Sequence, residues 1–344
     1  MSDAVIESPV RVPAEGETRE MAPGVRWLRM PLPMAGLDHI NLWLLDDGDG
    51  WTIVDSGLGT PRIKELWEHI FAHELGGRPV TRLICTHFHP DHLGQAGWIV
   101  ERTGAEFVMT AGEWTFGRMR WLGAPAEVPA QVIGFDRAAG FDATALDQLR
   151  QRGYGNFRKG VREVPRTFRR IADGDHLKIG GRRWSVRVGR GHSPEHACLY
   201  CPELDVLISG DQILPKISPH IGVYPGEPEA NPLRQYLASL DRFRDLPATT
   251  LVLPSHRDPF VNAGPRLDAL LVHHRERLDR LTDALSEPCT AAETMPALFR
   301  RAINGDNMFL AIAEALAHLN YLMAEGRVGR ERGADGVDRY RLAA

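Results

Sequence analysis

Three histidines and an aspartate within six residues restrict what this chain can fold into more than any other part of its sequence. His87, His89, Asp91 and His92 stand where an apolar strand pattern ends and a helical pattern begins. Imidazole and carboxylate are ligands that zinc, iron and manganese accept, and extended residues two apart project to the same side. We therefore expect His87 and His89 to share one metal ion, with Asp91 and His92 facing a second. A histidine-rich surface turn is the plain alternative.

Further ligand types recur downstream, each after an apolar strand pattern. His192 and Asp211 each follow a glycine, and His256 follows a serine. One such residue alone would be an ordinary polar loop residue, but the order and spacing of the whole set favour a two-metal site on a layered sheet. The predicted metal ligands are His87, His89, Asp91, His92, His192, Asp211 and His256.

The alternation of strand and helix patterns predicts an α/β sandwich. Between residues 113 and 170, glycines and prolines break this rhythm, which indicates an insertion. The expected strands are Val25–Met30, His39–Leu45, Trp51–Val54, Val80–Cys85, Glu106–Thr110, Arg183–Gly189, Ala197–Cys201, Asp205–Ser209 and Thr250–Pro254. The expected helices in this part are Pro61–Leu75, Leu93–Arg102 and Leu233–Phe243.

The motif HxHxDH, followed by GH, GD and a final histidine after a strand, resembles the metallo-β-lactamase superfamily over roughly residues 25–262. The resemblance implies a four-layer αββα sandwich with two metal ions. It implies one ion on His87, His89 and His192, another on Asp91, His92 and His256, and Asp211 as the bridge between them.

The same resemblance assigns roles to residues beside the ligands. It implies that Asp55 supports the ligand loop without binding metal. Two residues depart from the pattern: Glu195 stands where many relatives have glycine, and Ser255 replaces the glycine that usually precedes the last ligand. Both departures concern neighbours of ligands, so they bear on substrate contacts more than on metal binding.

The last third of the chain has a different pattern, with helices expected at Pro265–Ser286, Thr290–Arg301 and Asn307–Glu325 and a hairpin at Arg327–Leu342. Three helices and a hairpin resemble a winged helix, and the segment is similar to the tail of β-lactamase-like endoribonucleases. We expect a leader over 1–24, a catalytic domain over 25–262 and a winged-helix-like domain over 263–344.

Two divalent ions would suit hydrolysis, since a water shared between them loses its proton near neutral pH. We expect zinc, with iron or manganese also tolerated, and assign Asp91 and Asp211 as catalytic carboxylates. The expected substrate is a small-molecule ester or thioester, of the acyl-coenzyme A kind. An endoribonuclease or phosphodiesterase is the alternative, followed by a lactonase or a glyoxalase II type thioesterase. The complete ligand set argues against a non-enzymatic scaffold.

A cluster of basic residues hints at an anionic substrate. Residues 148–170 contain eight basic side chains and one acidic one, including Arg158 and Lys159, and arginine forks recognise phosphates. A solvated face that pairs with acidic residues elsewhere explains the same cluster equally well. The other expected substrate contacts lie just beyond ligands in the sequence: His196, Lys216, His220 and Tyr224.

Charge and composition limit the partners. The formal net charge is -4, and residues 265–344 hold eleven arginines, no lysine and twelve acidic residues. This balance disfavours a nucleic-acid partner, although the 148–170 cluster keeps that alternative open. We expect the tail to serve packing, homodimer formation or a pocket wall. The chain shows no membrane span and no secretory signal, so we expect a cytoplasmic protein.

Overall fold

A computed structural model describes residues 6–7, 11–34, 36–123, 125, 127–153, 156–299, 303 and 307–343. Parts of the expected leader and of the expected helix Thr290–Arg301 lie outside these residues. The chain forms two compact units that alternate along the sequence. The first comprises Met1–Ala124, Gly155–Pro219 and Arg242–Leu267, and the second comprises Pro125–Tyr154, His220–Asp241 and Asp268–Ala344. The linear domain boundaries given above stay a prediction.

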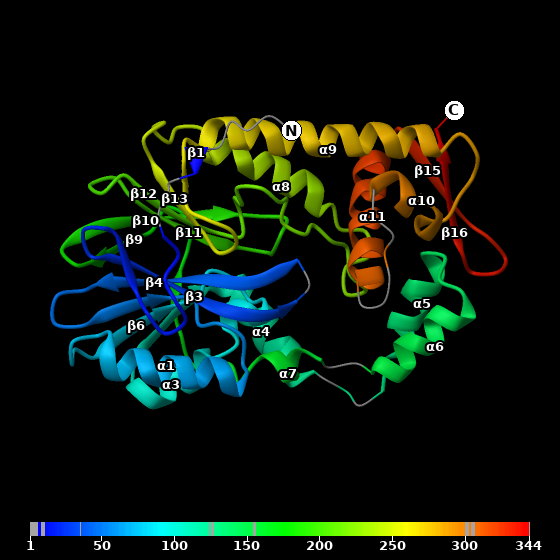
Figure 1. Cartoon of the computed structure of the whole chain (residues 1–344). Coiled ribbons are helices and arrows are strands. Elements are labelled where there is room, and N and C mark those ends of the chain that lie inside the picture. The colour runs from blue at the N-terminus through cyan, green and yellow to red at the C-terminus, as the bar shows by residue number, and fades with distance from the viewer. Residues whose placement is uncertain are drawn as a thin grey trace. The chain divides into compact units, whose positions relative to one another are not determined.

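The first unit contains two seven-stranded sheets, which lie one above the other in Figure 1. One sheet has the order β2-β3-β4-β5-β6-β7-β8. Its strands are β2 (Arg19–Ala22), β3 (Val25–Met34), β4 (Leu37–Asp46), β5 (Trp51–Val54), β6 (Val80–Ile84), β7 (Glu106–Thr110) and β8 (Arg169–Ile171). The other has the order β1-β14-β13-β12-β11-β10-β9. Its strands are β1 (Ile6–Glu7), β9 (His176–Ile179), β10 (Arg182–Gly189), β11 (His196–Cys201), β12 (Val206–Gly210), β13 (Leu251–Pro254) and β14 (Phe260–Val261).

Two apolar cores hold this unit together. One lies between the sheets, where Trp27 and Trp43 of the first sheet join Trp184 of the second in one buried cluster. The other lies between the first sheet and helices below it, around Trp67. The helices of the unit are α1 (Pro61–His73), α2 (Pro90–Leu93), α3 (Ala96–Thr103), α4 (Ala111–Leu122) and α7 (Phe157–Gly160). The α/β fold with two sheets and helices is therefore confirmed.

The sheet topology brings the polar segments of the sequence to strand ends. Strands β5, β6 and β7 are mutually parallel, and so are β12 and β13. The carboxyl ends of parallel strands meet at one edge of a sheet, where ligand sites form in open α/β folds. The histidine-rich loop follows β6, Asp211 follows β12, and His256 lies two residues after β13.

The helix expected at Leu93–Arg102 is wrong at its start, because the chain forms two helices separated at Gly94. A Cβ atom at Gly94 would lie 2.3 Å from the backbone nitrogen of Gly59. The carbonyl of Gly94 accepts a hydrogen bond from the N–H of Arg162, 2.8 Å away, so its partner lies outside the helix. Close approach of two distant chain segments thus ends α2, which a local pattern does not reveal.

The second unit is mainly helical and ends in a hairpin. The hairpin pairs β15 (Val328–Arg332) with β16 (Asp338–Leu342), within the predicted range, and its turn contains Gly333 and Gly336. The helices are α5 (Ala130–Ala138), α6 (Ala143–Arg152), α8 (Pro232–Leu240), α10 (Ala291–Leu298) and α11 (Asn307–Ala324). Helix α9 (Ala263–Ala284) begins in the first unit and continues in the second, and the short helix η1 spans Asp241–Phe243. The winged-helix assignment stays a prediction.

None of the helices within the described residues combines the length and the apolar character that a membrane span requires.

A buried carboxyl in the second unit gives a pH-dependent prediction. Asp136 in α5 is 5% exposed, and burial raises its pKa from 3.8 to about 6. Between these values the folded chain keeps a proton that the unfolded chain releases, so the free energy of unfolding falls as pH rises and stays low above pH 6. Asp136→Asn should therefore raise this free energy by about 2 kcal/mol at pH 8 and much less at pH 4.5.

Urea unfolding at both pH values measures this effect. Asp147→Asn, which changes an exposed carboxyl in α6, serves as the matched control and should have little effect at either pH. An equal effect of Asp136→Asn on the free energy of unfolding at pH 4.5 and pH 8 would contradict the raised pKa of Asp136.

Candidate metal centre

Three imidazoles from two loops converge on one point. His87 Nε2 lies 2.8 Å from His89 Nδ1 and 3.2 Å from His192 Nε2, and His89 Nδ1 lies 3.1 Å from His192 Nε2. Three ligands at the usual zinc–nitrogen distance would be about 3.3 Å apart along the edges of a tetrahedron. The three nitrogen atoms therefore have a spacing that suits a shared cation.

A second group of side chains meets beside the first. His256 Nε2 lies 3.3 Å from Asp91 Oδ2, and His92 Nε2 lies 3.6 Å from the same oxygen. The ligand atoms of these three residues all lie within 4.8 Å of one another. The structure thus brings the other three predicted ligands together as well.

Asp211 connects the two groups through its two carboxylate oxygens. Oδ2 lies 3.4 Å from His192 Nε2, whereas Oδ1 lies 3.4 Å from His256 Nε2 and 3.5 Å from His92 Nε2. One carboxylate therefore faces both groups, one oxygen to each. This is the geometry required of a ligand that bridges two ions.

The ring atoms that face away from the site are hydrogen-bonded by the protein. His92 Nδ1 donates to Asp55 Oδ2 at 2.8 Å, and His256 Nδ1 donates to the carbonyl of His39 at 2.9 Å. Asp55 also accepts a hydrogen bond from the backbone N–H of Thr86 at 2.7 Å, and it holds a left-handed φ of 65°. These contacts direct each Nε2 atom into the site, as expected of supporting residues around a metal.

The protonation states of His87, His89, Asp91 and Asp211 suit cation binding. Burial lowers the pKa of His87 and His89 well below the usual value, so both imidazoles are neutral. Burial alone would raise the pKa of Asp91, but His92 and His256 hold it at about 2. The same two histidines keep the pKa of Asp211 well below its ordinary value, against the effect of burial. In turn, Asp91 and Asp211 raise the pKa of His92 well above its usual value and that of His256 to about 10, against the effect of burial. Metals bind neutral imidazoles and ionised carboxylates, so a cation held by His92 and His256 would displace their protons.

Some buried atoms of the site lack the partners that buried polar atoms normally have. Among the described residues, His92 Nε2, His256 Nε2 and Asp211 Oδ1 are buried without a hydrogen-bond partner. An orphaned buried polar atom costs free energy, and a coordinated cation would satisfy all three. The cluster is therefore capable of binding metal ions.

Sequence reasoning missed several supporting residues, of which Asn41 in β4 is the most connected. Its Oδ1 accepts hydrogen bonds from Trp27 Nε1 and Arg29 Nε, at 2.9 and 3.0 Å. Its Nδ2 donates to the carbonyls of Pro254 and Arg257, at 2.9 and 2.6 Å. Asn41 thus ties one sheet to the loop of the other sheet that carries His256. A buried asparagine inside an apolar strand pattern was the only sequence signal.

The predicted substrate contacts fall in different places. His196 is fully buried, and its Nε2 accepts a hydrogen bond from the N–H of Asp211 at 3.0 Å, which favours a supporting role over a substrate contact. Lys216 is exposed in the first unit. His220 and Tyr224 belong to the second unit, where His220 Nε2 and the Tyr224 hydroxyl lie 2.9 Å apart.

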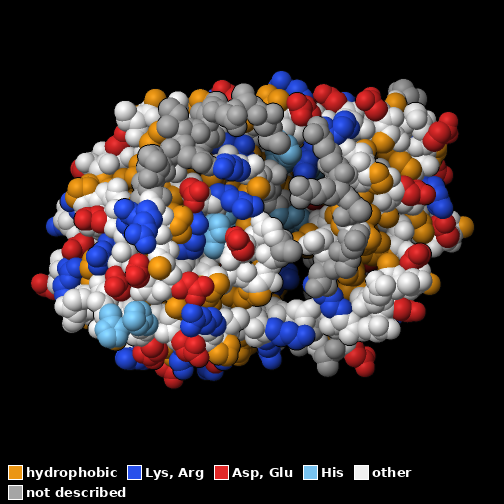
Figure 2. Space-filling model, viewed as in Figure 1, with side chains coloured by type: hydrophobic (Ala, Val, Ile, Leu, Met, Phe, Trp, Pro, Cys, Tyr) orange, Lys and Arg blue, Asp and Glu red, His pale blue; other side chains and the backbone are white. Residues whose placement is uncertain are grey.

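The basic cluster of residues 148–170 contains several side chains that already have partners. Its members divide between the two units, and several pair with acids, such as Arg150 with Asp147 and Arg169 with Glu106. The Arg158 guanidinium donates to the carbonyls of Trp121 and Leu122, which fastens α7 to α4. On the face in Figure 2, basic and acidic side chains are interspersed. Lys159 remains an exposed cation on α7.

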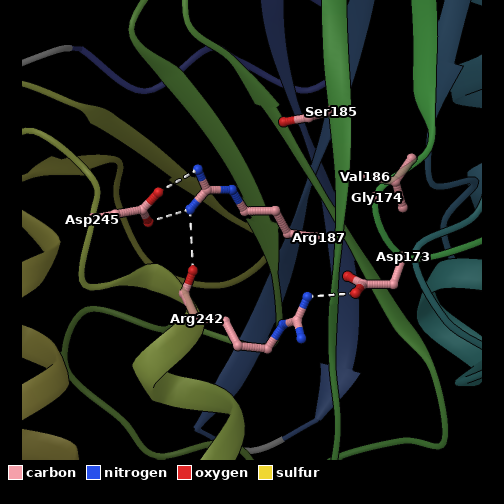
Figure 3. Close-up of a pocket in the computed structure, with 7 residues that line it drawn as sticks. All are labelled: Asp173, Gly174, Ser185, Val186, Arg187, Arg242 and Asp245. Atoms are coloured by element: carbon pink, nitrogen blue, oxygen red, sulfur yellow. Dashed lines mark hydrogen bonds and ion pairs between the residues drawn. The ribbon is translucent and has the colours of Figure 1, made fainter.

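A pocket elsewhere in the first unit has paired charges. It is lined by residues of β10 and by segments near it, and Figure 3 shows Arg187 between Asp245 and the carbonyl of Arg242. The Arg242 side chain in turn pairs with Asp173. Because the two guanidinium groups already have carboxylate partners, this pocket offers weaker recognition of an anion than its arginines suggest.

Comparisons with known proteins agree with this geometry. Residues 35–256 match the family model of the metallo-beta-lactamase superfamily, and residues 278–343 match that of the metallo-beta-lactamase-like C-terminal domain. A beta-lactamase domain protein from Burkholderia ambifaria has 45% sequence identity and a TM-score of 0.89, with 98% of each chain covered. A metallo-beta-lactamase family protein from Thermus thermophilus has 32% identity and a TM-score of 0.77, covering 94% of this chain and all of the other.

Two characterised groups of relatives are more distant. Human acyl-coenzyme A thioesterase MBLAC2 is 24% identical over 204 residues, which cover 57% of this chain and 65% of the human protein. The hydroxyacylglutathione hydrolase of Erythrobacter litoralis is 26% identical over 248 residues, which cover 70% of this chain and 73% of that protein. The chain therefore matches just under two thirds of the length of the human relative.

The role of Asn41 can be tested by substitution. Asn41→Ala should lower the free energy of unfolding by about 3 kcal/mol, because it leaves several buried donors and acceptors without partners. Urea unfolding followed by tryptophan fluorescence, with a chelator present, measures the loss without a contribution from metal. Asn156→Ala, at a partly exposed asparagine of the same unit, is the control. Equal stabilities of the two variants would show that Asn41 does not connect the sheets.

Proposed function

The chain belongs to the metallo-beta-lactamase superfamily of hydrolases, and on that premise we propose that it hydrolyses a small-molecule thioester of the acyl-coenzyme A kind at a two-metal centre. The observation that carries the proposal is the pair of ligand groups joined by Asp211. The choice of a thioester rests on the relatives, since acyl-coenzyme A and hydroxyacylglutathione are both thioesters.

The proposed ligand assignment follows the observed groups. His87, His89 and His192 would hold one ion, and Asp91, His92 and His256 the other, with Asp211 shared. Zinc fits the nitrogen spacing and the mixed imidazole and carboxylate set, while iron and manganese accept the same ligands. Two such ions would lower the pKa of a bound water and polarise the thioester carbonyl.

The residues of the chain would prepare this chemistry. Asp91 and Asp211 are ionised, and their oxygens lie 3.3 and 3.4 Å from His256 Nε2, so both would lie close enough to a water held by the ions to orient it. Asp55 and the His39 carbonyl hold His92 and His256 in the tautomer that presents Nε2 to the site. The catalytic assignment of Asp91 and Asp211 is part of this proposal.

A panel of substrates tests the proposed reaction. The wild type should hydrolyse acyl-coenzyme A thioesters faster than aryl esters, lactones, phosphodiesters or short RNA. Asp211→Asn should lower kcat/KM by more than about 100-fold, the upper end of the effect of a residue that only supports a ligand. Asp245→Asn, at an exposed carboxyl of the same unit, is the control. If the wild type cleaves only RNA and Asp211→Asn does not cleave it, the thioester assignment is wrong.

Lys159 is the residue of the basic cluster best suited to test for an anionic substrate. Helix α7 lies beside the ligand loop, since the ring centroids of Phe157 and Phe88 are 6.4 Å apart. Lys159→Gln should raise KM for an acyl-coenzyme A thioester several-fold and leave kcat and the KM for a phosphate-free thioester unchanged. Lys178→Gln, at an exposed lysine of β9, is the control. An unchanged KM for the coenzyme A thioester would show that the basic cluster of residues 148–170 does not take part in substrate recognition through Lys159.

A further inference from the structure

One buried carboxylate touches both loops that supply the first group of imidazoles. Glu113, in the first turn of α4, is fully buried. Its Oε2 accepts a hydrogen bond from the backbone N–H of Phe88 at 3.0 Å. Its Oε1 accepts one from the Ser193 hydroxyl at 2.7 Å and another from the N–H of Glu195 at 2.6 Å. Phe88 stands between His87 and His89, and Ser193 directly follows His192, so Glu113 connects the two loops one residue away from the ligands.

Glu195 completes this connection from the opposite direction. Its Oε2 accepts a hydrogen bond from the N–H of Gly112 at 2.7 Å, and its carbonyl accepts one from the Thr110 hydroxyl at 2.9 Å. A Cβ atom at Gly112 would lie 2.9 Å from the same carboxylate oxygen, so the two groups are in close contact and a larger residue at this position would displace the Glu195 side chain. The start of α4 and the loop after β10 thus bind each other through both glutamates.

We propose that Glu113 is a positioning residue that sets the spacing between the His87 and His89 pair and His192, and that Glu195 holds it in place. The inference rests on the proposed two-metal centre. A carboxylate is required because each of its oxygens receives N–H or O–H donors, which a glutamine side chain cannot match. Whichever way the amide is oriented, its NH₂ group would face a donor.

The placement of Glu113 is not explained by packing alone. Burial raises the pKa of Glu113 to about 7, although the hydrogen bonds from Glu195, Ser193 and Phe88 lower it, so a buried carboxyl at this place costs free energy that an apolar side chain would not. The nearby start of α4 offsets part of that cost, since negative charge is favoured in the first turn of a helix. An apolar residue could fill the space, but it would leave the backbone N–H groups of Phe88 and Glu195 unsatisfied and the two loops unconnected.

Metal titration tests the inference independently of catalysis. The metal-free protein is titrated with Zn²⁺ against a competing chelator, and with Co²⁺ by absorption spectroscopy. His192→Ala and His256→Ala identify the signal of each ion. Glu113→Gln should lower the affinity for the ion associated with His192 by about 10- to 100-fold and leave the affinity for the other ion close to that of the wild type. Glu195→Ala, which alters a partly exposed side chain, should shift the same ion in the same direction by less.

The controls separate positioning from general stability. Glu101→Gln, at an exposed glutamate of α3, should bind both ions as the wild type does. If Glu113→Gln does not fold, the affinity of Glu195→Ala for the ion associated with His192 decides whether the positioning role holds. The positioning role would be overturned if the folded glutamate variants bound both ions with wild-type affinity, or if both affinities fell equally. The two-metal centre would stand in either case. A wild type that binds fewer than two ions would instead overturn the proposed function, on which this inference rests.

Discussion

Asp211 is the group on which the candidate site depends, because its two oxygens face two different sets of nitrogen atoms. Asp211 is buried, yet His256 and His92 hold its pKa well below the ordinary value, so its carboxylate is ionised where the two groups meet. Each ligand group arrives from a different strand end, so the groups meet only in the folded chain. The free energy of binding the proposed ions would then contribute to the free energy of folding.

The supporting residues make this arrangement rigid from outside. His92 is held by Asp55, His256 by the His39 carbonyl, and the Asp211 backbone by His196. Asn41 connects the second sheet's loop to the first sheet, and Glu113 connects two loops within the site. Because these contacts are buried or partly buried, movement of a ligand side chain would break a hydrogen bond that has little access to water. Such preorganisation keeps ligands in place before an ion arrives.

The local part of this fold could be predicted from the sequence, and the part set by distant contacts could not. The strands Trp51–Val54 and Glu106–Thr110 were predicted at their observed bounds, because short β-type runs between turn signals need no tertiary information. The break at Gly94 depends on the backbone of Gly59 and Arg162. Asn41 and Glu113 escaped notice for the same reason, since their partners lie as far as 216 and 82 positions away in the chain.

The geometry also links the histidine-rich loop to helices α4 and α7. Phe88 has its N–H held by Glu113, while its ring lies 5.8 Å from Phe116 of α4 and 6.4 Å from Phe157 of α7. The residue between two ligands is therefore packed against the helices beside the site. Of these rings, Phe88 and Phe157 are buried, and packed buried side chains transmit displacements to their neighbours. A change in the packing of α7 at Phe157 should thus be felt by His87 and His89, whereas a change at the exposed Lys159 should not.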